Sequence, residues 1–301
     1  MNDANPDPLP PAAEPAAIRT EREAQADASI EAPIAVTGGA PDAPRRLLPA
    51  DLRVPWAWRD LLWFLLFAVI SNFVLGMLVE LAAIALFHAP KPDISGDNVN
   101  PAVVIIAQAL WFGATILYLR AVVRVRTAEP FWRSIGWRGL PGSEHGARAV
   151  ALGFVGAGAV MAVVVSLLGQ LRQDNGQLPI EKLFNSRLSV VLLMSLGILV
   201  APLVEETIFR GFLYPLLARR FGVPVGVVVT GLLFGAMHGP QLWPAYTQIG
   251  LMMLVGVVLT WVRARTGTVT ASYLMHLGYN SLLFLGFVIA TGGLRHFTAG
   301  T

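Results

Sequence analysis

The chain has 301 residues, of which 55% are hydrophobic and 14% are charged, and its mean hydropathy is +0.61. A water-soluble domain needs more polar surface than this, so the composition excludes the soluble classes and predicts a membrane protein. Cysteine is absent, which excludes disulfides, thiolate metal sites and a cysteine nucleophile. The net charge is +3, and most arginines lie near the ends of apolar runs, so nucleic-acid binding is not indicated.

The first 55 residues differ in composition from the rest. Ala, Pro, Asp and Glu dominate residues 1–55, aromatic residues are absent, and no apolar periodicity appears. This composition is typical of a disordered tail. The tail also lacks the basic start and apolar core of a cleavable signal peptide, so we expect the first span to be an uncleaved anchor. Residues 56–295 are predicted to form a helical membrane domain.

Apolar runs predict the membrane spans, because a helix needs about 20 residues to cross the hydrocarbon core. The runs cover residues 61–87, 101–122, 147–168, 188–218, 223–238, 249–262 and 270–290. The predicted fold is therefore all-α and polytopic, with about seven transmembrane helices and a range of six to eight. The run at 249–262 is short for a membrane span. The run at 188–218 is long and contains Pro202 and Pro215, which predict a broken or tilted helix.

Arginines predict the orientation. They precede the first span, fill the loop between the second and third spans, and follow the fourth and sixth spans. Because cytoplasmic loops are enriched in Lys and Arg, we expect these segments and the amino terminus to be cytoplasmic. A composition rich in Ala, Pro and Arg is typical of bacterial proteins, so we expect the protein to be located in the bacterial inner membrane.

Nucleotide binding is not predicted. Gly153, Gly156 and Gly158 lie in the third run, but their spacing is not that of a nucleotide-binding loop and no strand precedes them. Close helix packing is the better interpretation of these glycines. A Walker loop is also absent, which argues against an ATP-driven pump.

Ionisable residues at membrane depth are costly and mark function more often than accident. Within the apolar runs they are Glu80, Glu205, Glu206, Arg210, His238 and His276, with Asn280 as a polar companion. Glu80 stands alone near one end of its span, where a structural role is expected. The remaining residues fall on the runs at 188–218, 223–238 and 270–290.

Helix geometry brings these three runs together. Glu206 lies as many residues before Gly222 as His238 lies after it, so a hairpin that turns near Gly222 returns both side chains to a similar depth. His276 is expected somewhat nearer the cytoplasmic end but in the same half of the membrane, and kinks at the prolines can absorb that difference.

Spacing within each run predicts shared faces. Glu206 and Arg210 are four residues apart, as are His276 and Asn280. Arg210 is expected to neutralise Glu206 in a low-dielectric site. Glu205 lies about 100° around the helix from Glu206, so its charge is neutralised less by Arg210. It is therefore better suited to take a proton from water. His276 and Asn280 can donate hydrogen bonds to an oxygen that becomes negative when a carbonyl is attacked.

Three motifs carry a family resemblance: Glu205-Glu206-Thr-Ile-Phe-Arg210, then Phe234-Gly-Ala-Met-His238, then His276-Leu-Gly-Tyr-Asn280. Over residues 188–290 the chain resembles the CAAX-protease and bacteriocin-processing (CPBP or Abi) family of intramembrane endopeptidases, which includes the type II CAAX prenyl endopeptidases. The resemblance implies a helical domain whose cavity opens to the cytoplasm and to lipid. The substrate would be a membrane-associated or lipidated protein or peptide.

The resemblance also implies a role for each motif residue. Glu205 would be the catalytic glutamate and would activate water together with His238. Glu206 and Arg210 would support the site.

His276 and Asn280 would form the oxyanion pocket in the same resemblance. Glu205, His238 and His276 are also candidate ligands of a catalytic zinc, although the sequence has no H-E-x-x-H helix. Whether the enzyme uses a metal or glutamate alone stays open, and glutamate alone is slightly favoured.

Two other functions remain as alternatives. A non-catalytic immunity or scaffold protein would keep the fold and use the polar cluster for binding. A small proton-coupled transporter would use the buried carboxylates and imidazoles as a relay, although the two halves show no internal repeat. A serine protease is not indicated, because a G-x-S-x-G elbow is absent.

Overall fold

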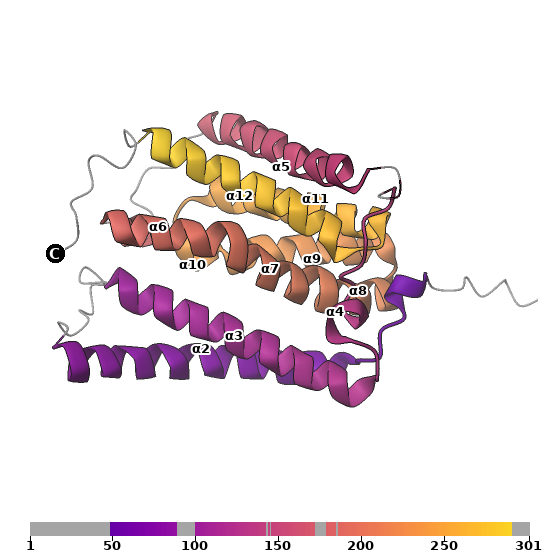
Figure 1. Ribbon diagram of the computed structural model, residues 1–301, viewed down its shortest axis with the longest axis horizontal. Helices are drawn as coiled ribbons and strands as arrows, with labels where there is room; N and C mark the ends of the chain where they lie inside the picture. Colours follow the sequence, from indigo (N-terminus) through magenta and orange to yellow (C-terminus); the bar gives the residue numbers. More distant parts are fainter. Residues whose placement is uncertain are drawn as a thin grey trace, which may run out of the picture. The chain divides into compact units, whose positions relative to one another are not determined.

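The computed structural model describes residues 49–88, 100–142, 144, 146–171, 179–184 and 186–290, and all structural statements below concern these residues. Within them the chain forms only helices and connecting loops (Figure 1), which confirms the all-α prediction. Residues 1–48 of the predicted tail and residues 291–295 of the predicted membrane domain lie outside the described residues.

Six helical stretches of the described chain are long and apolar enough to cross a membrane. They are α2 (Trp58–Phe87), α3 (Pro101–Arg126), α5 (Ala147–Gln170), the continuous stretch Arg187–Phe221, α11 (Tyr246–Thr266) and α12 (Val269–Ala290). The helix α9 (Val223–Met237) is apolar but shorter. The prediction of about seven spans is therefore confirmed. Four shorter pieces complete the described helices: η2 (Ala50–Leu52), α4 (Phe131–Ser134), η4 (Pro179–Leu183) and α10 (Gly239–Leu242).

The short apolar run at 249–262 belongs to a helix long enough to cross the membrane. Polar residues at both ends continue α11 to 21 residues. The helix stops at Gly267, whose backbone is left-handed with φ 70°, a conformation that glycine adopts without a steric penalty.

The stretch Arg187–Phe221 alternates between two kinds of helix. α6 (Arg187–Ser195), α7 (Ala201–Glu206) and α8 (Tyr214–Phe221) are α-helical, whereas η5 (Leu196–Val200) and η6 (Thr207–Leu213) are π-helical. Each π segment ends just before an α segment that has a proline at its second position, Pro202 or Pro215. Because proline lacks an N–H and crowds the preceding turn, the wider π turn accommodates it. The predicted break therefore takes the form of two widened turns.

Small residues allow the helices to approach closely. α5 lies along α12 (Figure 1). A Cβ at Gly158 of α5 would overlap the main-chain carbonyl of Met275, and one at Gly278 of α12 would overlap a carbonyl of α5. The predicted close packing is confirmed at Gly158 but is wrong at Gly153 and Gly156, where a Cβ would meet no atom within 4 Å.

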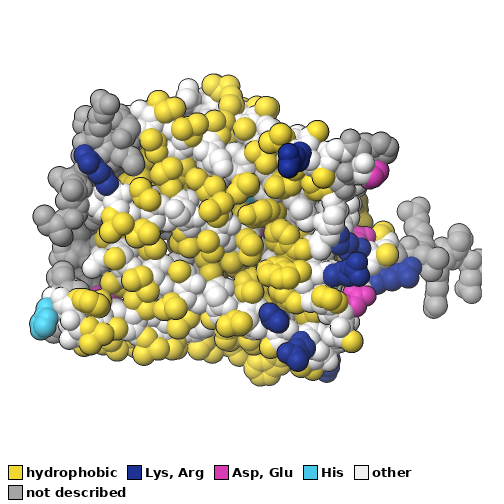
Figure 2. Space-filling model, in the orientation of Figure 1, with side chains coloured by type: hydrophobic (Ala, Val, Ile, Leu, Met, Phe, Trp, Pro, Cys, Tyr) yellow, Lys and Arg dark blue, Asp and Glu magenta, His cyan; other side chains and the backbone are white. Residues whose placement is uncertain are grey.

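The outward surface of the helices is apolar. Leu62, Phe73 and Phe87 of α2 are 65%, 74% and 79% exposed. Hydrophobic side chains cover most of the face drawn in Figure 2, and arginines gather toward one end of it. Such a surface requires lipid, because in water hundreds of square ångströms of apolar area would be in contact with solvent. The chain is an integral membrane protein.

Residues 49–57, here called the amino-terminal segment, pack against the helices. Leu52 and Trp56 are each 1% exposed. The Trp56 indole N–H donates to the Phe212 carbonyl at 3.0 Å, and the two rings stack at 5.2 Å. Asp51 pairs with Arg263 at 2.8 Å. The tail prediction is therefore corrected for residues 49–55, because their alternate apolar side chains are buried.

Candidate functional site

Glu206 lies at the centre of a buried polar cluster formed by α7, η6, α11 and α12. Its side chain is 0% exposed. Its Oε1 accepts from Arg210 Nη1 at 2.9 Å and lies 3.0 Å from His276 Nδ1. Its Oε2 accepts from Ser272 Oγ at 2.6 Å. A buried carboxylate is stable when it is paired and hydrogen-bonded in this way, so Glu206 is held in one position.

Arg210 forms the predicted ion pair with Glu206 and is also fully buried. Its remaining donors reach α11: Nη2 donates to the Gly256 carbonyl at 3.0 Å, and Nε donates to Thr260 Oγ1 at 3.2 Å. Its guanidinium carbon lies 4.3 Å from the centroid of the Phe234 ring. The arginine therefore ties the π-helical segment to α9 and α11 through charge-assisted hydrogen bonds and a cation–π contact.

His276 lies between the two glutamates. Because ionised Glu206 only accepts hydrogen bonds, the short contact to His276 Nδ1 requires a proton on that nitrogen. The other ring nitrogen, Nε2, lies 3.8 Å from Oε2 of Glu205. The Glu205 side chain is 19% exposed, in contrast to the fully buried Glu206. The difference predicted between the adjacent glutamates is present: one carboxylate is enclosed, and the other is open on one side.

Asn280 lies one turn beyond His276 on α12, but its amide faces η5. Its Nδ2 donates to the Gly197 carbonyl at 2.7 Å. In a π-helix that carbonyl would pair with the N–H of residue 202, and residue 202 is a proline. The asparagine therefore supplies the donor that Pro202 lacks. Its second amide hydrogen stays available to a ligand.

His238 follows the last residue of α9, as the hairpin through Gly222 predicts. Its Nδ1 lies 2.8 Å from the Phe234 carbonyl, which leaves Nε2 as the acceptor of a neutral ring. The Phe234 ring contacts both imidazoles, with centroids 4.8 Å from His238 and 5.7 Å from His276. Among the described side chains, no hydrogen bond or ion pair joins His238 directly to Glu205.

A catalytic zinc site needs three protein ligands close together. Among the residues that the structure describes, no three His, Asp or Glu side chains are gathered closely enough to hold a metal ion. Glu205, His238 and His276 therefore do not form a ready ligand set.

Sequence reasoning missed Ser272 and Thr260. Neither residue is charged. A hydroxyl inside an apolar helix can donate its hydrogen bond to a backbone carbonyl of the preceding turn, so a Ser or Thr in a span is not conspicuous in a hydropathy profile. One signal was present: Ser272 lies four residues before His276 and therefore shares its helix face. Thr260 donates to Gly256 at 2.7 Å and accepts from Arg210, which makes it a link between two helices.

Comparison with known proteins agrees with the three motifs. Residues 187–282 match the family model described as type II CAAX prenyl endopeptidase Rce1-like. An uncharacterized 24.3 kDa protein of Escherichia coli is 31% identical over 132 residues, which cover 42% of this chain. The match spans 60% of that relative's length. Nothing among the solved structures matches.

The family match and the geometry concern the same part of the molecule. The matched residues run from α6 to α12 and include both glutamates, Arg210, both histidines and Asn280. The resemblance stated from the motifs is thereby confirmed as a similarity: residues 187–282 match the model of the type II CAAX prenyl endopeptidase Rce1-like family.

Proposed function

We propose that the protein is an intramembrane endopeptidase that hydrolyses a peptide bond with water activated by Glu205. The observation that carries the proposal is the contrast within one glutamate pair. Glu206 is enclosed and neutralised by Arg210, while Glu205 is partly exposed beside His276. An enzyme needs one carboxylate to hold the site and another that can reach water.

Glu205 is the general base in this proposal. It takes a proton from a water molecule as the water oxygen attacks the carbonyl carbon, and it returns the proton to the amide nitrogen as the C–N bond breaks. His238 Nε2, an acceptor, orients the same water. Glu206 and Arg210 do not contact substrate, and they act by fixing His276 and the π-helical segment. General-base catalysis of this kind contributes roughly 10²–10⁴-fold to the rate.

His276 and Asn280 stabilise the oxyanion. Since His276 Nδ1 donates to Glu206, Nε2 donates to the oxyanion only when the ring carries both protons. The free amide hydrogen of Asn280 is the second donor.

The π-helical segments support a functional role for this cluster. Single widened turns inside α-helices occur frequently at functional sites. Here η6 contains Arg210 and directly follows Glu206, and η5 contains the carbonyl that holds Asn280. The polar groups of the site are thus positioned by the irregular turns.

The substrate class follows from the family match and the location. The cluster lies on membrane-spanning helices, so the substrate is a membrane-associated or lipidated protein or peptide. The family model names prenyl endopeptidases, which makes a prenylated carboxy-terminal peptide the first substrate to test.

The decisive experiment compares the parent with Glu205→Gln in proteoliposomes, using quenched peptide libraries with and without a carboxy-terminal farnesyl group. Glu80→Gln is the matched control, because it makes the same change on α2, outside the site. We expect the parent and the control to cleave and Glu205→Gln to lose at least about 100-fold in kcat.

Two results would reject the proposal. If the parent cleaves no peptide, the non-catalytic immunity or scaffold function becomes the better hypothesis. If Glu205→Gln cleaves as fast as the parent, the base is a different group. A transporter would instead acidify or alkalinise proteoliposomes on addition of a solute, with Glu205→Gln blocking that flux. Full activity after chelation and metal analysis would rule out a zinc mechanism.

A further inference from the structure

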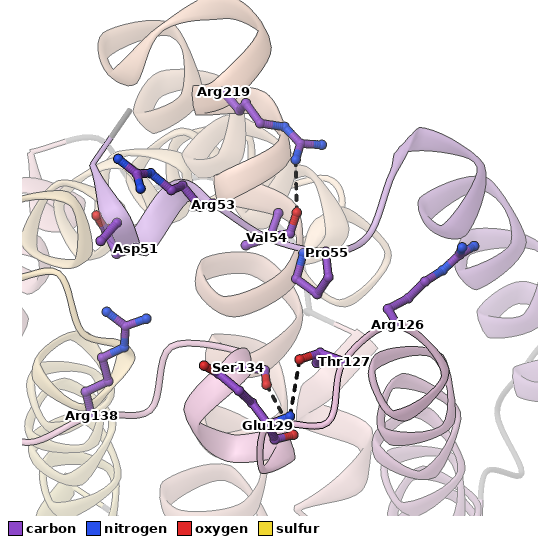
Figure 3. A pocket seen from close by; sticks show the side chains of 11 residues that line it. Asp51, Arg53, Val54, Pro55, Arg126, Thr127, Glu129, Ser134, Arg138 and Arg219 are labelled. Carbon is purple, nitrogen blue, oxygen red and sulfur yellow. Dashed lines mark hydrogen bonds between the residues drawn. The ribbon is translucent and has the colours of Figure 1, made fainter. Parts of the chain in front are cut away.

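A polar cavity lies at the end of the helices where the arginines gather. Its volume is about 520 Å³, within the range of roughly 300–1,000 Å³ that is usual for ligand pockets. The amino-terminal segment, the α3–α4 connection, the loop at Arg138 and α8 form its walls (Figure 3). Of the residues assigned above to the peptidase reaction, none lines it.

The cavity wall is positively charged. Arg53, Arg126, Arg138 and Arg219 line it, against Asp51 and Glu129. Arg126 also pairs with Asp60 at 2.7 Å, and Asp51 also pairs with Arg263 at 2.8 Å, and neither of these partners lines the cavity. The formal charges of the six lining residues sum to +2, which favours an anionic occupant.

Arg138 is exposed and offers open donors to the cavity. Within the part of the chain that the structure describes, its guanidinium makes no hydrogen bond or ion pair, although its backbone is fixed. Its N–H donates to Thr268 Oγ1 at 3.1 Å, and its carbonyl accepts from the hydroxyls of Thr268 at 2.9 Å and Thr270 at 2.7 Å. The arginine is therefore held in place at its base, and its donors remain open.

Arg219 borders the same space from α8 (Figure 3). Its guanidinium donates to the carbonyls of Val54 at 3.0 Å and Trp56 at 3.2 Å, and it forms no ion pair among the described residues. Neutral carbonyls orient the guanidinium without cancelling its charge. Two guanidinium groups thus face one cavity with their charge available.

The cavity lies where the membrane surface meets water. Arg126 is the last residue of α3, and Arg219 belongs to the last turn of α8. Trp58 at the start of α2 is 39% exposed, and Trp132 of α4 is 43% exposed. Exposed tryptophans at the ends of spans mark the level of the lipid headgroups.

We propose that this cavity binds the phosphate-bearing headgroup of an anionic phospholipid. Guanidinium groups recognise phosphate oxygens through paired, charge-assisted hydrogen bonds, and Arg138 supplies a complete, unpartnered fork. Inorganic phosphate has the same chemistry but fills only a small part of about 520 Å³, whereas a headgroup with its glycerol fills more of it. The acyl chains would lie on the apolar outer surface of the helices. This site does not depend on peptidase activity.

The test measures binding of phosphatidylglycerol to the purified full chain by native mass spectrometry, with phosphatidylcholine and inorganic phosphate as separate probes. Arg138→Gln removes the open fork while the backbone contacts to Thr268 and Thr270 stay. Arg124→Gln is the matched control, because Arg124 is an exposed arginine at the same end of α3 and does not line the cavity. We expect Arg138→Gln to weaken phosphatidylglycerol binding at least about tenfold and the control to change it less than about threefold.

A variant that is expected to strengthen binding keeps the test independent of protein folding. Glu129→Gln removes a negative charge from the wall, so we expect tighter binding of phosphatidylglycerol, a gain that a misfolded protein cannot produce. Equal losses in Arg138→Gln and Arg124→Gln would overturn the proposal, because they would indicate general attraction to the basic end. Equally tight binding of phosphatidylcholine, or of inorganic phosphate alone, would also overturn it.

Discussion

Replacing Arg210 with methionine isolates the buried charge pair. Arg210 and Glu206 are both 0% exposed and 2.9 Å apart, and methionine fills much of the space of arginine without its charge. Breaking a buried pair by removing one partner costs about 3–5 kcal/mol, because the other charge is left uncompensated. The lost hydrogen bonds to Gly256 and Thr260 belong to the same change. We expect Arg210→Met to lower the free energy of unfolding by about 4 kcal/mol.

A second substitution separates charge from packing. Glu206→Gln in the Arg210→Met background removes the orphaned charge, so the double variant should recover about 2 kcal/mol of that loss. The measurement is equilibrium unfolding in mixed micelles, followed by tryptophan fluorescence. Arg124→Met, an exposed change on α3, is the control and should shift unfolding by less than about 0.5 kcal/mol. If the double variant is no more stable than Arg210→Met, Glu206 is not the charge that Arg210 compensates.

Three other substitutions test contacts outside this pair in the same unfolding titration. Asn280→Ala leaves the Gly197 carbonyl without a donor, so we expect a loss of about 1–3 kcal/mol together with a lower kcat; an unchanged stability would contradict that contact. Trp56→Phe keeps the ring stacking and removes only the indole N–H, so the expected loss is about 1 kcal/mol, against about 3–5 kcal/mol for Trp56→Ala. Gly278→Val forces α12 away from α5 and should cost more than about 2 kcal/mol, whereas Gly76→Val on α2 meets no neighbour and should cost less than 1; equal costs would argue against tight α5–α12 packing.

Hydropathy predicted most of the fold because lipid imposes one requirement on every span. A segment in the hydrocarbon must be apolar and must satisfy its own backbone, so apolar runs and helices coincide. The exceptions have local causes. The helix α11 extends into polar residues at both ends, which a hydropathy reading counts as loop. Residues 49–55 were assigned to the tail because their two buried apolar residues, Leu52 and Val54, are too few to give a pattern.

The candidate site was predictable where spacing determines contact. Glu206 and Arg210 meet because they are four residues apart, and Gly222 is the turn that brings α9 back along α8. Contacts between segments that are far apart in the sequence were harder to predict. A proline shows that a helix is disturbed but does not say that the turn widens, so the pairing of Asn280 with Gly197 had no signal in the sequence. Likewise, the position of Phe234 against both imidazoles depends on how α9 is rotated.

The seven-residue segment Thr207–Leu213 also constrains how the chain can change in evolution. A π turn contains one residue more than an α turn, so deleting a single residue there would let the segment close into an unbroken α-helix. Every backbone bond would be satisfied and the span would still cross the bilayer. The helices on either side would keep nearly the same directions, because a π turn takes up its extra residue without rotating them. The side chains inside the segment, Arg210 among them, would change direction relative to their partners on α11. Loss of one codon would thus preserve a well-folded membrane helix and displace the arginine of the buried ion pair.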